Sequence, residues 1–429
     1  MIVQVILWEQ LVGAIAWDAR RNVGVFEFTE EFARQGWDIA PLLMPLEDLQ
    51  RGQRAFSFPE LSARTYEGLP GMLADALPDA FGNTVLRAWL RSQGRTAASL
   101  TPLEKLSYMG KRAMGALEFR PTTEVAEPQE EIEVNQLVAL TNRVMASKET
   151  MDLRLSDDEE MAMAELIRVG TSAGGQRPKA LIGYHPETKQ VKSGQLALEE
   201  GFEYYLLKFD GVHEGSLGDP KGYGRSEMAY YRMALDCGIH MMPCTLLEEN
   251  GRAHFMTQRF DRGPAGEKYH MQTLCAMSHF DYNQPGIYSY EDAFEEMRAL
   301  NLGYDEIEAL YRRMIFNVVA RNQDDHTKNI SFLMDTSGKW VLSPAYDLTW
   351  SYNPTGEWTN RHQMSIAGKR DDFTPKELIE VGNRQSIRNP NKILEQVVEV
   401  VSRWEEYSQA YEVPEPLSAR IKDTHRLMW

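Results

Sequence analysis

Short runs of alternating apolar and polar residues open the chain and predict β-strands. Residues 1–60 follow this period of two, most clearly at Val23–Phe28, and a further strand is expected at Ala116–Arg120. Between these strands the apolar positions change to a helical spacing in three segments, Met72–Phe81, Thr84–Ser92 and Leu103–Tyr108. The chain is therefore expected to begin with a small β-rich part followed by short helices.

The middle of the chain mixes helices with apolar strands. Pro121–Glu131 is rich in proline, threonine and glutamate and is the strongest linker candidate. Helices are expected at Glu133–Ala146 and from Ser156 to about Val169, because Ser156 and Glu159 have the spacing of a capping box. Two strands, a helix and a hairpin are expected next, at Ala180–Tyr184, Phe202–Phe209, Arg225–Cys237 and around Asn250-Gly251.

A helical spacing dominates after residue 258. The expected helices are Tyr290–Leu300, Tyr304–Arg321, Pro375–Val381, Asn389–Tyr407 and Leu417–Lys422. One hairpin is expected among them, formed by Ile330–Met334 and Trp340–Leu342. These changes of pattern suggest three domains, residues 1–125, 126–257 and 258–429.

The composition is that of a soluble globular protein. Of the 429 residues, 43% are hydrophobic and 25% are charged, and no run of eighteen apolar residues predicts a transmembrane helix. The N-terminus lacks a signal-peptide pattern, and the three cysteines have no metal-ligand spacing. We therefore expect a cytoplasmic protein without a membrane partner. The net charge of −17 opposes direct binding to DNA phosphates.

The segment Asn322–Asn329, which reads N-Q-D-D-H-T-K-N, carries the clearest chemistry. Asp324 and Asn329 have the spacing of a kinase catalytic loop, in which the aspartate accepts the substrate hydroxyl's proton and the asparagine holds magnesium. His326 is expected to be a hydrogen-bonding scaffold residue, because no other His or Cys lies at ligand spacing. The alternative is a segment that only shapes a turn, since Asp and Asn side chains readily bond their own backbone.

The hairpin after this segment delivers a second carboxylate, Asp347, at the end of a strand. A magnesium ion that bridges ATP phosphates takes hard oxygen ligands from one or two side chains. Asn329 and Asp347 would supply them once the hairpin brings them together. The pattern then specifies a base and two metal ligands in one geometry, which favours phosphoryl transfer over the turn alternative.

A glycine-rich segment, a strand lysine and a helix glutamate precede the Asn322–Asn329 segment, in the order found in kinases. Residues 170–179 read G-T-S-A-G-G-Q-R-P-K and can hold phosphates through backbone N–H groups; a flexible surface loop is the alternative. Lys208 lies in an apolar strand, and Glu227 on the next helix is its expected partner. A solvent-facing lysine at the end of an edge strand is the alternative, and Lys179 competes for the phosphate role.

Gln258–Phe260 occupies the place where a kinase-like chain crosses from its sheet-bearing lobe to its helical lobe. Backbone amides at such a crossing would meet adenine. Arg259 and Arg262 flank Asp261, and a structural ion-pair cluster is the favoured interpretation of that pattern.

Five motifs, in this order, resemble the HipA family of serine/threonine kinases, many of which are toxins of bacterial toxin–antitoxin pairs. They are G-T-S-A-G-G-Q-R-P-K-A-L, Y-L-L-K-F, Q-R-F-D-R, N-Q-D-D-H-T-K-N-I-S-F-L and L-S-P-A-Y-D-L, over roughly residues 155–350. A looser likeness extends over nearly the whole chain. The resemblance implies an α+β, two-lobed protein-kinase-like fold with a β-rich N-terminal part and an all-helical C-terminal lobe. The three predicted domains then correspond to a HipA-type N-terminal subdomain, a kinase N-lobe and a helical kinase C-lobe.

The resemblance also implies roles for individual residues, with ATP and Mg²⁺ as cofactors. Asp324 and Lys208 would be catalytic, and Asn329 and Asp347 would be the magnesium ligands. The implied nucleotide contacts are Ala173, Gly174, Gly175, Gln176, Arg177, Pro178, Lys179, Lys208, Glu227, Gln258, Arg259, Phe260, His326, Lys328, Asn329 and Tyr346.

Regulation and partners follow from the same resemblance. Family members phosphorylate themselves on a hydroxyl in or just before the glycine-rich loop, which here would be Thr171 or Ser172. A phosphate adds a charge of about −2 and would displace the loop from the ATP phosphates. The implied substrate is a protein with a Ser/Thr acceptor, such as an aminoacyl-tRNA synthetase. The implied partner is a helix-turn-helix antitoxin of HipB type, through which alone the chain would meet DNA.

Two other functions stay open at the level of sequence. The same Asp…Asn…Asp pattern serves small-molecule phosphotransferases, and an acceptor pocket has no recognisable sequence pattern. A transcriptional corepressor that binds ATP without toxicity is the other, and the intact charged residues of the motifs argue against it.

Overall fold

The structure, a computed structural model, describes residues 1–92, 100–122, 134–146, 178–194, 197–213, 216–217 and 222–427. The chain forms two compact units. The first consists of Met1–Ala40, Met44–Lys221 and Thr245–Met271, and the second of Pro41–Leu43, Gly222–Cys244 and Gln272–Trp429. The Asn322–Asn329 segment and Asp347 therefore belong to one unit, the second.

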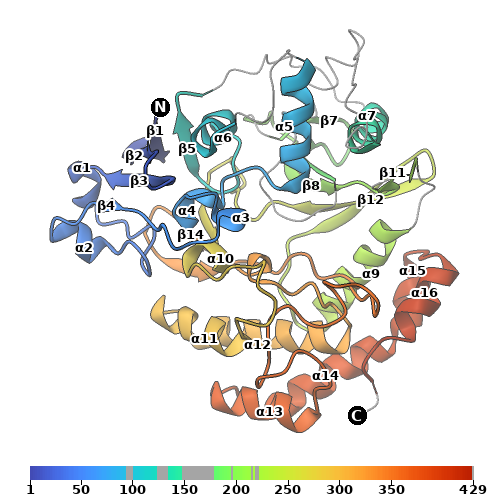
Figure 1. Cartoon of the computed structure of the whole chain (residues 1–429). Helices are drawn as coiled ribbons and strands as arrows, with labels where there is room; N and C mark the ends of the chain where they lie inside the picture. The colour runs from blue at the N-terminus through green and yellow to red at the C-terminus, as the bar shows by residue number, and fades with distance from the viewer. Residues whose placement is uncertain are drawn as a thin grey trace. The chain divides into compact units, whose positions relative to one another are not determined.

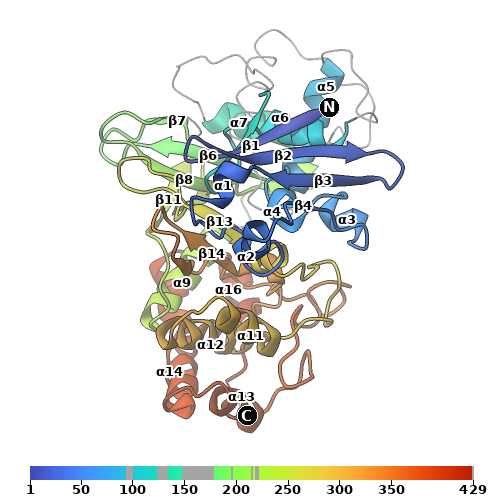
Figure 2. The same cartoon turned by 90° about the vertical axis from the view of Figure 1, so that its left-hand side faces the viewer.

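A five-stranded antiparallel sheet forms the N-terminal part of the first unit (Figure 2). Its strands, in the order β4-β3-β2-β1-β5, are β1 (Ile2–Leu7), β2 (Gln10–Asp18), β3 (Val23–Phe28), β4 (Ala55–Phe56) and β5 (Leu117–Arg120). Along β3 Gly24, Phe26 and Phe28 are buried on one face, whereas on the other face Val25 is half-buried and Glu27 is exposed. The alternation that predicts strands here is confirmed, and its physical cause is a sheet with one buried face.

Short helices accompany this sheet. They are α1 (Glu30–Ala33), α2 (Leu46–Gln50), α3 (Ala63–Tyr66), α4 (Gly71–Ala74), α5 (Ala80–Ser92) and α6 (Pro102–Met109). The single helix expected over Met72–Phe81 is wrong, because α4 ends at Ala74. Pro78, which has no backbone N–H, lies in the break, and Asp79 then accepts a hydrogen bond from Gly82 N (2.6 Å) at the start of α5.

The second sheet of the first unit has the order β11-β12-β8-β6-β7. Its strands are β6 (Lys179–Tyr184), β7 (Val191–Ser193), β8 (Glu203–Lys208), β11 (Cys244–Glu249) and β12 (Arg252–Gln258). Asn250 and Gly251 both have positive φ values at the turn between β11 and β12, as the predicted hairpin requires. The helix α7 (Val134–Ala146) contacts β9 (Val212–His213) and β10 (Ser216–Leu217), which pair with each other.

Helices dominate the second unit (Figure 1). They are α9 (Tyr223–Asp236), α10 (Leu274–Met277), α11 (Tyr290–Ala299), α12 (Tyr304–Val319), α13 (Pro375–Arg384), α14 (Pro390–Ser402), α15 (Trp404–Ala410) and α16 (Glu415–Lys422). Helix α12 packs beside α11 and α14, and its side chains from Arg313 to Val319 are all buried. None of the helices in the described part of the chain is long and apolar enough to cross a membrane.

Two expectations about this part of the chain need correction. It is not all-helical, because β13 (His270–Thr273), β14 (Ser331–Met334) and β15 (Trp340–Leu342) form a three-stranded sheet. The helix expected over Asn389–Tyr407 is two helices, since Arg403 N bonds Val400 O three residues back and closes α14. The break lets Trp404 pack edge-on against Tyr230 and His425, contacts that the local sequence does not encode.

Candidate active site

The candidate catalytic loop begins where α12 ends. The apolar side chains of Met314, Ile315 and Val318 anchor the end of the helix in the core. Arg321 then adopts a left-handed backbone conformation (φ 57°), which turns the chain away from the helix axis. The segment Asn322–Asn329 therefore starts from the buried, rigid end of α12.

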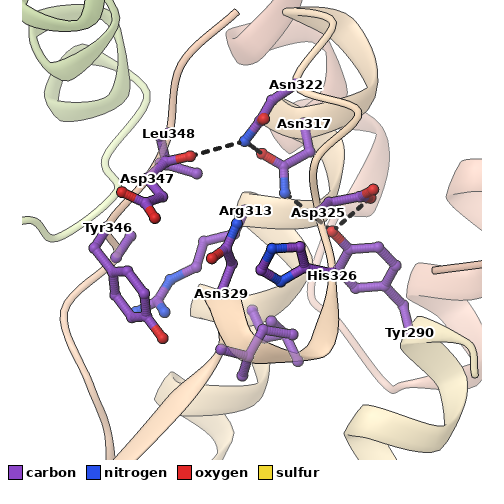
Figure 3. Close-up of a pocket in the computed structure, with 13 residues that line it drawn as sticks. Tyr290, Arg313, Asn317, Asn322, Asp325, His326, Asn329, Tyr346, Asp347 and Leu348 are labelled. Atoms are coloured by element: carbon purple, nitrogen blue, oxygen red, sulfur yellow. Dashed lines mark hydrogen bonds between the residues drawn. The ribbon is translucent and has the colours of Figure 1, made fainter. Parts of the chain in front are cut away.

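A chain of buried hydrogen bonds ties this loop to α11 and α12 (Figure 3). The Asn322 amide Nδ2 donates to Asn317 Oδ1 (2.9 Å), and Asn317 Nδ2 donates to the Tyr290 hydroxyl (3.0 Å). The Tyr290 hydroxyl in turn donates to Asp325 Oδ2 (3.0 Å). Burial, and then the Asp325 carboxylate, raise the pKa of Tyr290 well above its ordinary value, so its hydroxyl stays protonated and acts as the donor.

Asp324 presents its carboxylate at the surface of this loop. Its side chain is 41% exposed, whereas that of His326 is only 9% exposed and lies with Nε2 3.9 Å from Asp324 Oδ1. The Asn329 amide Nδ2 donates to the Asp324 backbone carbonyl (2.8 Å) and so closes the loop on itself. The two residues that the sequence singles out are therefore held together by a direct contact.

The β14–β15 hairpin brings Asp347 to the same place. The strands pair in register from Phe332 opposite Leu342 to Met334 opposite Trp340, as predicted. Beyond β15, Ala345 N donates to the His240 carbonyl (2.8 Å), and Asp347 adopts a positive φ of 53°. The Asn322 amide also donates to the Asp347 carbonyl (3.2 Å), so a single side chain links the candidate catalytic loop to the segment that carries the second carboxylate.

Asn329 and Asp347 face one cavity of about 20 Å³, enough for one small ion or water molecule (Figure 3). The Asn329 Nδ2 group is already engaged with the Asp324 carbonyl, which leaves the amide oxygen as its ligand atom. An amide oxygen and a carboxylate fit Mg²⁺, which prefers oxygen ligands and keeps several waters. Within the described residues no cluster of three or more His, Cys, Asp or Glu could hold a metal ion. An amide oxygen and one carboxylate thus fit a magnesium ion that phosphates and water also bind.

The same cavity is lined by a buried cation, Arg313, whose place in the candidate site no sequence pattern indicated. Its guanidinium donates to the Ser343 carbonyl, and among the residues described its Nε and Nη1 have no hydrogen-bond partner. Burial lowers the pKa of Arg313 to about 10, although the neighbouring Tyr346 and Tyr290 oppose this, so the group is charged at neutral pH. A fixed positive charge therefore lies beside the candidate metal ligands.

Three further groups around Asp325 and Asp324 were also missed by sequence reasoning. Asp325 is 1% exposed and accepts hydrogen bonds from His362 Nδ1 (2.7 Å) and the Gln363 backbone N–H (2.8 Å), in addition to Tyr290. Trp358 Nε1 donates to Asp324 Oδ1 (2.6 Å). The paired aspartates in the motif were the only sequence signal, because these partners lie 34 to 38 residues away along the chain.

Lys208 and Lys179, in the first unit, lie directly opposite each other on β8 and β6. Side chains of directly opposed residues share one face of a sheet, and Phe255 of β12 completes this row with its ring 5.6 Å from Lys208 Nζ. Lys179 Nζ lies 3.7 Å from Asp79 Oδ2, and both side chains are 3% exposed. The alternative of an edge-strand lysine is excluded, because β8 is the central strand of its sheet.

The segment Gln258–Phe260 ends β12 and leads into a buried ion cluster. Asp261 is fully buried and accepts bonds from Arg259 Nε (2.9 Å) and Nη2 (2.7 Å), from Arg262 Nη1 (2.9 Å) and from the Gly115 backbone N–H (2.7 Å). The structural interpretation of the two arginines is confirmed. The Arg259 guanidinium is occupied by this cluster and its N–H bonds the Tyr204 carbonyl.

Some of the remaining predicted nucleotide contacts lie in the described part of the chain, and the others lie outside it. Glu227 lies on α9 in the second unit and is 3% exposed. Tyr346 donates its hydroxyl to the Lys328 carbonyl (2.6 Å), and Lys328 Nζ lies 5.0 Å from the Tyr282 ring centroid. Pro178 immediately precedes β6. Eight residues of the glycine-rich segment lie outside the described part of the chain: Gly170, Thr171, Ser172, Ala173, Gly174, Gly175, Gln176 and Arg177.

Known proteins similar to this chain were found by sequence and by structure. The family model for the HipA-like C-terminal domain matches residues 171–404, and the model for the HipA N-terminal domain matches residues 3–120. A curated relative, "Putative kinase Y4mE" of Sinorhizobium fredii (strain NBRC 101917 / NGR234), is 28% identical over 136 residues. That match covers 30% of this chain and 32% of the relative, about a third of each.

Two solved structures are similar. HipA from a Shewanella oneidensis MR-1 toxin–antitoxin complex with HipB and its operator DNA matches with a TM-score of 0.66 and 16% identity, over 98% of this chain and 95% of that one. The Helicobacter pylori proinflammatory kinase CtkA matches with a TM-score of only 0.33 and 11% identity, over 52% of this chain and 88% of that one. The first match shows that this chain has the HipA fold. Because the C-terminal model alone matches more than half of its 429 residues, the chain belongs to the HipA family.

Proposed function

We propose that this protein is an ATP-dependent serine/threonine-protein kinase and the toxin of a toxin–antitoxin pair. The observation that carries the proposal is the arrangement of Asp324, Asn329 and Asp347 in the second unit. Asp324 has an exposed carboxylate and is bonded through its backbone carbonyl to the Asn329 amide, and Asn329 and Asp347 face a common cavity. This is the set of groups that phosphoryl transfer requires of a protein: a base that orients a hydroxyl and oxygen ligands for a metal.

Each residue of the candidate site would have a separate role in phosphoryl transfer. Asp324 orients the acceptor hydroxyl and receives its proton, which its exposed position allows. Asn329 and Asp347 would hold Mg²⁺, which when bound offsets the charge of the ATP phosphates. The Asn322 side chain keeps these groups in fixed relation, because it bonds both Asn317 and the Asp347 carbonyl.

The nucleotide contacts in the first unit remain predictions from family membership. Lys208 is the candidate phosphate-binding lysine, and its place on a central strand opposite Lys179 supports a rigidly held pair of positive charges. Gln258–Phe260 would contact adenine through the backbone. Autophosphorylation on Thr171 or Ser172 would regulate the enzyme.

The proposed protein partner is a helix-turn-helix antitoxin of HipB type. The solved Shewanella relative is a complex with HipB and operator DNA, and the net charge of −17 suits a basic DNA-binding partner better than DNA itself. The proposed substrate is a translation component with a Ser/Thr acceptor, such as an aminoacyl-tRNA synthetase. Cytoplasmic location is part of the same proposal.

Intact mass after incubation with Mg-ATP tests this function. In the time that the wild-type protein takes to gain one phosphate on Thr171 or Ser172, we expect the Asp324→Asn variant to gain almost none. Asp335→Asn is the matched control, because Asp335 is an exposed carboxylate that caps the β14–β15 turn and should leave the reaction unchanged.

The other outcomes are equally informative. A phosphate at another residue would keep the kinase but reject the assigned regulatory site. Bound ATP without any mass change would favour a small-molecule phosphotransferase or an ATP-binding corepressor. Absence of ATP binding by unphosphorylated protein would refute the proposal as a whole.

A further inference from the structure

Residues 358–363 lie across three consecutive residues of the catalytic loop. Trp358 Nε1 donates to Asp324 Oδ1 (2.6 Å), and the Gln363 side chain donates to the Gln323 carbonyl (3.2 Å). The Gln363 backbone N–H and His362 Nδ1 donate to the two oxygens of Asp325. These four groups of the segment all donate to loop oxygens, so the segment acts as a single clamp on residues 323–325.

The clamp leaves the Asp324 carboxylate asymmetric. One oxygen, Oδ1, is bound by the Trp358 indole N–H, whereas Oδ2 accepts no hydrogen bond from any residue that the structure describes. The side chain is nevertheless 41% exposed, so Oδ2 is open to an incoming group. An indole N–H can only donate, and it therefore cannot compete for the proton that a base must receive.

We propose that Trp358 is a positioning residue for the catalytic base: it fixes the Asp324 carboxylate through Oδ1 so that Oδ2 faces the acceptor hydroxyl. This inference rests on the proposed kinase function. In the transfer step the hydroxyl oxygen forms the bond to the γ-phosphorus, the bond from that phosphorus to the ADP oxygen breaks, and the hydroxyl proton goes to Oδ2. Trp358 takes no part in these bond changes.

The other contacts of the clamp fix the position of the Trp358 indole, although this segment is only partly buried. Asp325 is 1% exposed and His362 is fully buried, so their hydrogen bond is a fixed point in the core. Gln363 also donates from its side chain to the Trp358 and Arg361 carbonyls, which fixes the backbone of the segment. The indole is thus placed by buried anchors four and five residues away from it.

The test is the substitution Trp358→Phe, which removes the N–H donor and keeps an aromatic ring. Trp350→Phe is the matched control, since Trp350 also donates its indole N–H, to Thr424 Oγ1 (2.9 Å), away from Asp324. Phosphate transfer from Mg-ATP is measured as an initial rate over a range of ATP concentrations. We expect kcat of Trp358→Phe to fall about ten- to a hundredfold, as a loosened catalytic group implies, with KM for ATP changed less than about twofold.

A double-mutant cycle separates positioning from general destabilisation. If Trp358 acts through Asp324, Trp358→Phe should reduce the residual rate of Asp324→Asn by less than about twofold, because the group that it positions is already lost. Trp358→Leu provides a second variant without the donor should the phenylalanine variant fold poorly. ATP affinity equal to wild type shows that a variant is folded.

Several results would overturn the inference. One is an unchanged kcat for Trp358→Phe. Another is an increased kcat, which would mean that the indole blocks the base. The third is an equal loss of rate when Trp358→Phe is made in the wild-type protein and in Asp324→Asn. Failure of the kinase function itself is distinguishable, because the wild-type protein would then show no transfer and the Trp350→Phe control would show none either.

Discussion

Substitution of Asp261 by asparagine is expected to destabilise the first unit strongly. Asp261 is fully buried, and four N–H groups from Arg259, Arg262 and Gly115 donate to its carboxylate. An asparagine in its place keeps one acceptor oxygen and turns an NH₂ group toward two guanidinium groups. Both arginines would then be buried without a counter-charge, and desolvation makes this costly.

The magnitude follows from the loss of one partner in a buried ion cluster. Such a change costs about 3–5 kcal/mol in the free energy of unfolding, and the retained acceptor oxygen places Asp261→Asn near the lower end, at about 3 kcal/mol. With a urea dependence of up to about 3 kcal/mol per molar, the unfolding midpoint of the first unit should fall by about 1 M or more.

The pH dependence has a definite sign. Burial raises the pKa of the Asp261 carboxyl, but Arg259, Arg262 and the hydrogen bonds to the carboxylate outweigh burial and hold the pKa well below its ordinary value. The stabilisation is therefore complete above the unfolded pKa of about 3.9 and is lost as the pH falls below it. The difference between wild type and Asp261→Asn should be constant from pH 7 to 5 and shrink below about pH 4.

Hydrogen exchange of peptides from β12 in increasing urea is the suitable assay, because it reports on the first unit separately from the second. Glu47→Gln serves as the control, since Glu47 pairs with Arg51 on the surface of the first unit and should change the unfolding free energy by less than about 0.5 kcal/mol. A loss below about 1 kcal/mol for Asp261→Asn at pH 7 would refute the argument that the cluster depends on this carboxylate.

Two further predictions concern the second unit. Tyr290→Phe removes the hydroxyl that joins Asn317 to Asp325 and leaves these buried polar groups without their partner. The free energy of unfolding of the second unit, measured in urea, should fall by about 1–3 kcal/mol. An unchanged unfolding midpoint would contradict the hydrogen-bond network. Asp347→Asn removes one charge at the cavity shared with Asn329 and should leave the unfolding midpoint near wild type while raising the Mg²⁺ concentration needed for phosphate transfer at least tenfold. A normal Mg²⁺ requirement in that variant would reject Asp347 as a ligand.

Local patterns sufficed for most elements and for the outline of the candidate site. The period-two pattern at Val23–Phe28 and the Asn-Gly turn at Asn250 define strands and a hairpin because their causes, pleating and turn geometry, act within a few residues. The spacing of Asp324 and Asn329 predicted a kinase-like loop, and in the structure the Asn329 amide donates to the Asp324 carbonyl. The five motifs indicated the family, which the family models confirm.

Tertiary structure alone decided which groups surround these residues. Trp358, His362 and Tyr290 reach Asp324 and Asp325 from 34 to 37 residues away, and Gly115 reaches Asp261 across 146 residues. No local pattern specifies such pairings, because they depend on how distant segments return to one another. The division of α14 from α15 has the same origin, since the burial of Trp404 against Tyr230 outweighs a helical pattern that runs on without a break.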